Sequence, residues 1–477
     1  MPSLKLGPRR VQRFFCPKPL VGLSNNHIAS IGVAIGAALV FYGLLLGETG
    51  DIWKAAGIGC GALTLFSTRA IPEIVTAFAI FLSALAVNTI PREEVFNGFM
   101  SSGFWLLVSG IILGAAISAT GLAARISERL IAVTGPSFPR AIVALAVVGM
   151  GLGILIPSTM PRIIVMIPIA AALADRLGLS ASGRGAIGLI ATATAATLLP
   201  TYTILTANLP TIVQVGAMDQ LYGVQSTYSG YFLLNLPVNI LRFVVIVALM
   251  VGFIRDPVSS KTQSAKAAES TKPEQRRLLI VLSAAIALWM TDFLHGIAPA
   301  WIAMATAGIV IWPRFGMLKP TAMKEQIDLT PAIFMASIFT VVAIARGAGL
   351  DQLLADVIVT RLPLHKDAEL SSLYAIYGFS LTLSHLTTAP AAPAVLVPFA
   401  ASLSDTTGFS LEAVSMIQIL GISTPLFPYQ APPLIVAMSI SKVPNAIFLR
   451  LCLWLAFIVT VIGVPITYLW WRLIGFV

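Results

Sequence analysis

The sequence predicts an all-α polytopic membrane protein with an N-terminal span and two inverted five-span repeats, each repeat carrying a re-entrant hairpin and a broken helix. Of the 477 residues, 57% are hydrophobic and 10% are charged. Soluble domains carry about 25% charged residues, whereas a membrane span needs about 20 mainly apolar residues. Breaks rich in Ser, Thr and Pro interrupt the apolar pattern at corresponding places in the two halves. Such paired breaks are typical of membrane proteins that bind a solute near the bilayer midplane.

The first half begins with a basic arm, residues 1–27, which we expect in the cytoplasm because Lys and Arg concentrate on that side of a membrane. Single spans are predicted at 28–47, 53–68, 72–90 and 102–120. Two shorter runs, 141–156 and 161–174, either form a re-entrant hairpin or cross fully as two spans, and the loop charges fit both cases. Their length of about 14–16 residues favours the hairpin. The half ends with a broken helix, 185–200 with 208–217, and a span at 229–253.

The second half repeats this order after a polar linker, residues 254–277, whose Ser- and Lys-rich composition predicts a flexible cytoplasmic connector. Its predicted elements are spans at 278–291, 297–312 and 330–346, a hairpin at 370–386 with 390–403, a broken helix at 411–424 with 431–440, and a span at 446–470. The chain therefore divides into residues 28–253, with the N-terminal span and the first repeat, and residues 278–477, with the second inverted repeat.

Matching residues support one duplicated unit. Gly121-Leu122 corresponds to Gly349-Leu350, and Pro168 corresponds to Pro398. The offset between the matching positions stays near roughly 220–230 residues, which indicates a repeat. Each Gly-Leu pair precedes a short amphipathic segment, which we expect either along the membrane interface or as an ordinary connecting helix. Five spans is an odd number, so the second copy must be inverted relative to the first.

Charge and motif content limit the function classes. From the basic loops we expect the N-terminus in the cytoplasm and the C-terminus outside. The expected location is a bacterial inner (plasma) membrane. The net charge of +10 is therefore attributed to these loops rather than to a nucleic-acid partner. Cys16, Cys60 and Cys452 lack metal-site spacing, and the four His residues form no enzyme motif. We expect no catalytic residues and no cofactor, with Na⁺ as the candidate coupling ion.

Two irregular elements are expected to meet in each half, namely the hairpin tip and the break in the next helix. In the first half these are residues 157–162 and Leu199–Pro210, and in the second half Ser384–Pro390 and Thr424–Pro433. Unwound carbonyls and hydroxyls suit Na⁺, and helix N-termini suit an anion. Four helix starts around one cavity could hold an oxyanion with few cationic side chains, which fits the scarcity of Lys and Arg within the spans.

Arg162 is the exception to that scarcity. It follows the first tip, where its guanidinium could bind a carboxylate of the substrate or could form a structural pair. His385 is interpreted as a packing histidine, with a substrate contact or a proton-sensitive group as the alternatives. Asn208 and Gln430 lie in the breaks and are expected to line the cavity rather than only form turns. Asp292 lies at a span end, where we expect interfacial capping.

Five stretches together resemble the divalent anion:sodium symporter family of the ion transporter superfamily. They are Thr68–Pro72, Glu93–Phe96, Ser109–Leu122, Ser158–Pro168 and Leu288–Gly296. The resemblance covers nearly the whole chain from about residue 60. It implies an inverted-repeat homodimer in the lipid bilayer that moves its binding domain as an elevator. It also implies transport of di- and tricarboxylates or sulfate, by sodium symport or by exchange.

Members of that family carry a Ser-Asn-Thr triplet at each tip, and here both asparagines are absent. Pro157 and Arg162, on either side of the first triplet, resemble the oxoglutarate/malate and citrate carrier branch. The resulting substrate candidates are Ser158, Thr159, Met160, Arg162, His385, Thr387, Thr388, Gln430 and Pro432. The cation candidates are Ser158, Thr159, Thr206, Ala207, Asn208, Ser384, Thr388 and Ala431.

The leading hypothesis is a secondary active transporter of small organic di- or tricarboxylates, coupled to sodium or working by exchange. Transport of sulfate or another inorganic oxyanion is an alternative. A cation/proton antiporter of the same superfamily is a further alternative, although Glu73, Asp175 and Asp292 all lie at span ends rather than in the core. The pattern leaves the anion and the coupling ion open.

Overall fold

Helices make up all the regular secondary structure of the described residues. The computed structural model describes residues 25–122, 125, 137–156, 159–180, 183–253, 273–314, 316–441 and 443–477. Within these ranges seven helices are long and apolar enough to cross a membrane, and four shorter apolar helices accompany them. The predicted all-α membrane fold is confirmed.

The first half contains the helices that its apolar runs predict. They are α2 (Asn25–Leu45), α3 (Asp51–Thr68), α4 (Glu73–Val87), α5 (Arg92–Val95), α6 (Ser102–Thr120), α8 (Phe138–Leu155), α9 (Thr159–Arg176), α10 (Arg184–Leu198), η4 (Pro200–Thr203), α11 (Leu209–Tyr222) and α12 (Tyr228–Phe253). A short turn, η3 (Asn97–Met100), precedes α6. The linker residues 254–272 lie outside the described residues.

The second half follows the same order. Its helices are α13 (Pro273–Met290), α14 (Asp292–His295), α15 (Pro299–Ile311), α16 (Pro320–Gln326), α17 (Thr330–Gly347), α18 (Leu350–Arg361), α19 (Glu369–Leu386), α20 (Ala392–Leu396), η5 (Val397–Phe399), α21 (Ala400–Thr407), α22 (Leu411–Ile422), η6 (Pro428–Gln430), α23 (Pro432–Ser441), α24 (Asn445–Ile458) and α25 (Val464–Leu473). A π-helical turn, Val459–Gly463, joins the last two.

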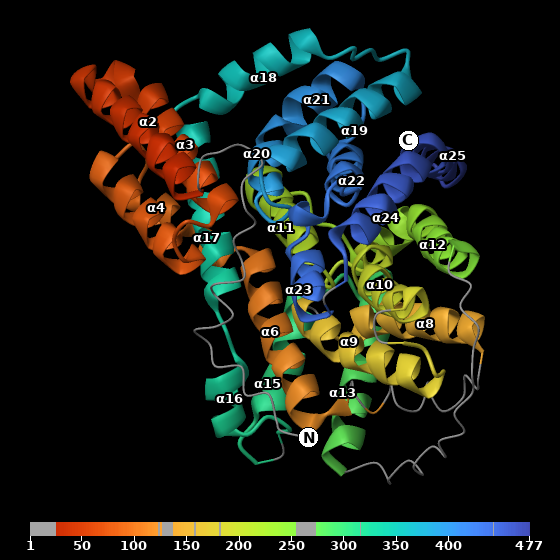
Figure 1. Ribbon diagram of the computed structural model, residues 1–477. Coiled ribbons are helices and arrows are strands. Elements are labelled where there is room, and N and C mark those ends of the chain that lie inside the picture. The colour runs from red at the N-terminus through yellow and green to blue at the C-terminus, as the bar shows by residue number, and fades with distance from the viewer. Residues whose placement is uncertain are drawn as a thin grey trace.

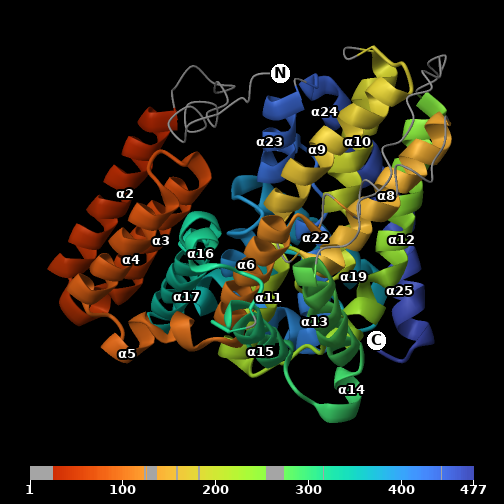
Figure 2. The same cartoon turned by 90° about the horizontal axis from the view of Figure 1, so that it is seen from below.

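Helices α2, α3 and α4 lie together on one side of the molecule, and α8 and α12 lie on the opposite side (Figures 1 and 2). The packing of α2 against α3 depends on glycine, because a Cβ at Gly36 would lie 2.6 Å from the carbonyl oxygen of Gly57. Small residues of this kind let membrane helices approach closely. Helix α18 runs along the edge of the molecule in Figure 1, between α17 and the α19–α21 segment.

Helix contacts recur between the two halves in reciprocal pairs. Helix α6 packs against α15, and α4 packs against α17. Helix α8 packs against α10, as α19 packs against α22. Each hairpin also reaches the other half, since α9 contacts α23 and α20 contacts α11. The elements paired by the sequence repeat therefore occupy corresponding places in the contact pattern.

The arms of the hairpins are longer than predicted. Helices α8, α9 and α19 each contain 18 residues. The premise that the hairpin arms are too short to cross the bilayer was therefore wrong. The chain nevertheless doubles back between α8 and α9, which run in opposite directions in Figures 1 and 2. Pro168 lies inside α9 without ending it, which neighbouring helices permit in membrane proteins. The last arm is divided into α20, η5 and α21.

Two glycines in left-handed backbone set the ends of equivalent helices. Gly121, with φ of 70°, closes α6 through bonds from its N–H to the carbonyls of Ile117 and Ser118. Gly349, with φ of 71°, separates α17 from α18. Glycine adopts this conformation without the strain that a side chain causes. The first amphipathic segment, 123–130, lies outside the described residues apart from residue 125, so only α18 represents that prediction.

Candidate functional site

The first hairpin tip meets the first broken helix through buried hydrogen bonds. Thr159, the first residue of α9, donates its hydroxyl to Asn208 Oδ1 at 2.7 Å. Arg162 Nη2 donates to the carbonyl oxygen of Ala207 at 2.6 Å and to Thr159 Oγ1 at 2.9 Å. Asn208 Nδ2 in turn donates to Thr201 Oγ1 at 3.3 Å. Four residues named from the sequence, Thr159, Arg162, Ala207 and Asn208, therefore lie together. Ser158 lies outside the described residues.

Proline and threonine explain why the helix breaks between α10 and α11. Pro200 and Pro210 lack the N–H group that continues a helix, and α11 restarts with Pro210 in its first turn. The hydroxyl of Thr201 donates to the carbonyl of Leu198 at 2.8 Å and so satisfies an acceptor at the end of α10. All residues from Leu199 to Asn208 are buried. Irregular backbone at membrane depth is thus enclosed by protein, as its polar groups require.

Arg162 is completely buried, with an exposed fraction of 0%. Glycine makes the space for it, because a Cβ at Gly153 of α8 would lie 2.7 Å from Arg162 Nη1 and 2.6 Å from Thr201 Cγ2. The hairpin therefore carries a guanidinium into the broken helix and leaves room for it on the opposite arm. Met160 is partly buried and Thr206 is 1% exposed.

The second hairpin tip meets both broken helices at a small cavity of about 10 Å³. Ser384 and Ala389 line it from the tip, and Gln430 and Ala431 line it from the second break. Tyr202 and its neighbours Leu198 and Leu199 line it from the first break. A cavity of this size holds about one water molecule. The second tip, the second break and the start of the first break therefore share this small cavity, which we call the composite site.

Side chains of the second tip bond mainly to their own backbone. The hydroxyl of Ser384 donates to the carbonyl of Leu381 at 2.8 Å, and His385 Nδ1 bonds to the same carbonyl. Thr387 donates weakly to the carbonyl of Thr388 at 3.4 Å. The imidazole of His385 also packs edge-on against Phe427, with ring centroids 5.9 Å apart. Its Nε2 is buried without a hydrogen-bond partner among the described residues, so the interpretation of His385 as a packing residue stays a prediction.

Gln430 both lines the cavity and forms the turn. Its Oε1 accepts the backbone N–H groups of Leu426 and Phe427, each at 2.8 Å. The side-chain oxygen therefore stabilises the loop, while the residue also lines the cavity as expected from the sequence. The next helix, α23, begins with Pro432 and Pro433. Because proline has no N–H, this helix start offers fewer donors to an anion than the start of α11.

A second buried arginine was missed, and Arg162 is not the only exception to the scarcity of buried cations. Arg242 of α12 is 2% exposed. It donates from Nη1 to Asn239 Oδ1 at 2.9 Å, and from Nη2 to Ser423 Oγ at 2.8 Å and Thr424 Oγ1 at 2.9 Å. The signal in the sequence was the polar series Asn235, Asn239 and Arg242 at helical spacing within an apolar run. Charged side chains in membrane spans are commonly functional.

Buried polar side chains also join the two halves. Gln214 of α11 donates to Gln418 Oε1 of α22 at 2.7 Å, and Gln418 donates to the carbonyl of Leu396 at 2.8 Å. Both glutamines are 0% exposed. At the end of α11, the hydroxyl of Tyr222 donates to the carbonyl of Pro398 in the second hairpin at 2.9 Å. The first broken helix is thus held to the second broken helix and to the second hairpin.

Asp292 acts as a helix cap. Its Oδ2 accepts the N–H of Tyr228 at 2.5 Å, and its Oδ1 accepts the hydroxyl of Ser229 at 2.5 Å. A carboxylate at a helix N-terminus satisfies unpaired N–H groups and the helix dipole. This geometry agrees with the capping role expected for Asp292. It is the one buried Asp or Glu among the described residues.

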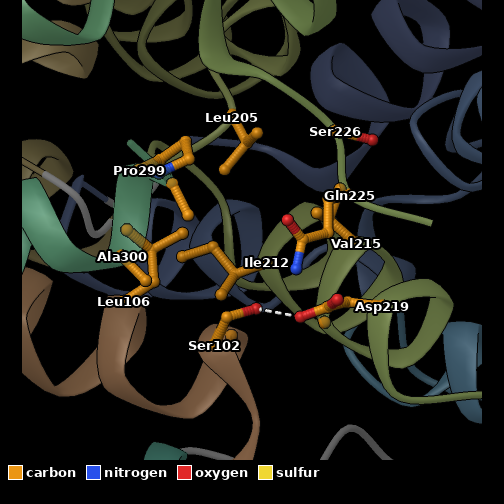
Figure 3. Close-up of a pocket in the computed structure, with 13 residues that line it drawn as sticks. Ser102, Leu106, Leu205, Ile212, Val215, Asp219, Gln225, Ser226, Pro299 and Ala300 are labelled. Atoms are coloured by element: carbon orange, nitrogen blue, oxygen red, sulfur yellow. Dashed lines mark hydrogen bonds between the residues drawn. The ribbon is translucent and has the colours of Figure 1, made fainter. Parts of the chain in front are cut away.

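A further cavity, of about 30 Å³, lies between α6, α11 and α15 (Figure 3). Ser102 at the start of α6 donates its hydroxyl to Asp219 Oδ2 of α11 at 2.5 Å across this cavity. Close by, Gly103 and Gly216 bring the two helices together, since a Cβ at Gly103 would lie 2.9 Å from Gly216 Cα. None of the site residues named from the sequence lines this cavity.

Solved transporters share the fold. The YdaH transporter of Alcanivorax borkumensis matches with a TM-score of 0.55 and 17% identity, over 83% of this chain and 90% of that chain. Neisseria gonorrhoeae MtrF, whose structure illuminates a class of antimetabolite efflux pumps, matches with a TM-score of 0.52 and 15% identity, over 83% and 96%. At these identities the likeness shows the fold alone.

Sequence comparison gives the family. A protein of Cupriavidus necator named only as a membrane protein is 24% identical over 397 residues, which cover 80% of this chain and 76% of that protein. The family model for citrate transporters (CitMHS) matches residues 63–423, which is most of the chain. The predicted membership of the ion transporter superfamily is thereby confirmed. Membership of its divalent anion:sodium symporter branch stays a prediction. The chain is an integral membrane transporter and belongs to the citrate transporter family.

Proposed function

We propose that this chain is a secondary active transporter of small organic di- or tricarboxylates. The observation that carries the proposal is the guanidinium of Arg162, which is completely buried where the first hairpin tip meets the first broken helix. Guanidinium groups bind carboxylates through paired, charge-assisted hydrogen bonds. The family match to citrate transporters supports a carboxylate rather than an inorganic oxyanion as the transported anion.

Helix starts add partial positive charge around the same point. Helices α9 and α11 begin at Thr159 and Leu209, on either side of the bond between Thr159 and Asn208. The first N–H groups of a helix have no partner within that helix and attract anions. The paired prolines at the start of α23 leave fewer N–H groups to attract an anion at the second break. The anion is therefore expected to bind mainly at the first tip.

The same contacts favour exchange over sodium symport. Three candidate cation ligands, Thr159, Ala207 and Asn208, bond to the guanidinium of Arg162 or to one another. A positive charge already lies among these oxygens, and it repels a second cation. Arg162 therefore takes the place of a coupling ion at the first site. On this basis one anion moves inward as another moves outward.

Transport requires movement, because the cavity between the second tip and the two breaks is only about 10 Å³. We propose an elevator movement of the unit that contains both hairpins and both broken helices. It moves past the helices α2–α6 and α13–α17, as the resemblance to elevator transporters implies. The close contact of Gly103 on α6 with Gly216 on α11 gives this boundary a smooth surface, and the Ser102–Asp219 hydrogen bond holds the present position.

Labelled citrate uptake into proteoliposomes tests the function. Vesicles loaded with unlabelled citrate or malate are expected to take up label faster than empty vesicles, with the same rate in the presence and absence of a sodium gradient. Uptake driven only by a sodium gradient contradicts exchange. Uptake of labelled sulfate without uptake of citrate would identify the chain as an inorganic oxyanion transporter. Absence of anion transport under every gradient refutes the proposal. Among the described residues, no Asp or Glu besides the capping Asp292 is buried, which counts against a cation/proton antiporter.

A further inference from the structure

Arg242 is a buried cation that the proposed site at Arg162 does not use. Its three hydrogen-bond acceptors are the side-chain oxygens of Asn239, Ser423 and Thr424, all of them neutral. Within the part of the chain that the structure describes, no carboxylate oxygen lies within 4.0 Å of its guanidinium. A buried charge that is bonded only to neutral groups is poorly compensated. An incoming carboxylate is a stronger acceptor for it than a hydroxyl.

The position of Arg242 places it beside the composite site. Ser423 and Thr424, which it contacts, begin the second break. Arg242 also lines a cavity of about 10 Å³ together with Leu199 and Pro425. Leu199 and Pro425 line the cavity at the second hairpin tip as well. The two small cavities therefore adjoin at these residues.

The two arginines bracket the unwound segment of the first broken helix. Arg162 contacts its last residues, Ala207 and Asn208, and Arg242 lines a cavity with its first residue, Leu199. They come from separate helices, α9 and α12. An anion with charge at both ends of a short carbon chain can meet a guanidinium at each end. A monoanion can use only one.

We propose that Arg242 binds a second carboxylate of the substrate and thereby makes the site selective for polyanions. This inference rests on the proposed transport of organic carboxylates. In the closed state Ser423 and Thr424 hold the guanidinium in place, and the substrate carboxylate replaces these hydroxyls as its acceptor. Arg162 then holds the first carboxylate, and Arg242 determines whether a second one adds to binding.

The test compares glutarate with glutaramate, in which a neutral amide replaces one of the two carboxylates. Each is measured as an inhibitor of labelled citrate uptake in proteoliposomes. The unmodified protein should bind glutarate more tightly by on the order of 10- to 100-fold, the usual value of one hydrogen bond to a charged group. Arg242→Gln should remove most of that preference and leave inhibition by glutaramate nearly unchanged. Arg242→Lys, which keeps the charge, should retain part of the preference.

Arg472→Gln is the matched control, because it removes the same charge from an arginine that is 54% exposed and paired with Glu369 on the surface. It should leave the glutarate preference intact. The inference is overturned if the unmodified protein binds the two inhibitors equally, a result that needs no variant. It is also overturned if Arg242→Gln weakens both by the same factor, as loss of a purely structural bond does. Absence of citrate uptake by the unmodified protein instead refutes the proposed function.

Discussion

We expect Gly153→Ala to displace Arg162 from the first break while leaving every ionisable side chain in the protein. The added methyl group would lie 2.7 Å from Arg162 Nη1, 2.6 Å from Thr201 Cγ2 and 3.1 Å from Ile204 Cδ1. These separations are far below normal contact distance, and α8 and the first break are both buried here. Either the guanidinium or the loop must therefore move.

The expected magnitudes follow from two opposing effects. Overpacking of a buried site costs about 1–3 kcal/mol, and alanine gains about 0.8–1.0 kcal/mol over glycine in a helix. The net loss of stability is then roughly 0–2 kcal/mol. Hydrogen bonds to a charged group contribute about 1.5–3 kcal/mol, so a displaced Arg162 should weaken citrate binding by roughly 10- to 150-fold. The effect on binding should thus exceed the effect on stability.

The chain supplies a matched control in the same helix. A Cβ at Gly151 would meet no heavy atom within 4 Å outside its own stretch of helix, so Gly151→Ala should be neutral or slightly stabilising. The assay measures the inhibition constant of unlabelled citrate in proteoliposomes and the thermal unfolding midpoint in detergent. If Gly153→Ala and Gly151→Ala behave alike in both measurements, the space beside Arg162 has no functional importance and the reasoning fails.

Arg162→Ala should raise the inhibition constant of citrate by on the order of 100-fold, and an unchanged constant assigns Arg162 to a structural role. Thr159→Asn alone should leave uptake independent of sodium, because Arg162 still lies among the candidate cation ligands; sodium-stimulated uptake by the single variant contradicts that view. Gly216→Leu should prevent transport but retain citrate protection in thermal unfolding, since the side chain meets Met335 Cε 2.9 Å from the Cβ position; normal uptake argues against movement at this boundary. Asp292→Ala should lower stability by about 1–2 kcal/mol through loss of the cap on α12, and an unchanged unfolding midpoint contradicts the capping role.

The first break was predictable because its chemistry is local. Pro200 and Pro210 interrupt hydrogen bonding wherever they occur, and Arg162 is conspicuous in an apolar segment. Their meeting at Ala207 and Asn208 followed from placing a hairpin tip beside the next broken helix. The inverted arrangement of the repeats stays a prediction, supported by the reciprocal packing of α6 with α15 and of α4 with α17.

The second site was less predictable because hydroxyl and amide groups have several acceptors within reach. Ser384 bonds back to its own helix and Gln430 to its own loop, and composition cannot show which acceptor such a side chain takes. Arg242 was missed for a different reason. It lies in the middle of a long, regular span, where no Pro- or Gly-rich break draws attention, and only its spacing from Asn239 indicates an inward face.

The amide pair between Gln214 and Gln418 has a consequence for leakage. Since it fastens α11 to α22 in the buried interior, separating those two helices breaks the bond from Gln214 Nε2 to Gln418 Oε1 and leaves these two groups in an environment that cannot satisfy them. This bond therefore opposes any movement that requires α11 and α22 to part. Under the proposed elevator movement α11 and α22 travel together, so the contact between them stays closed to protons and small ions while the anion crosses.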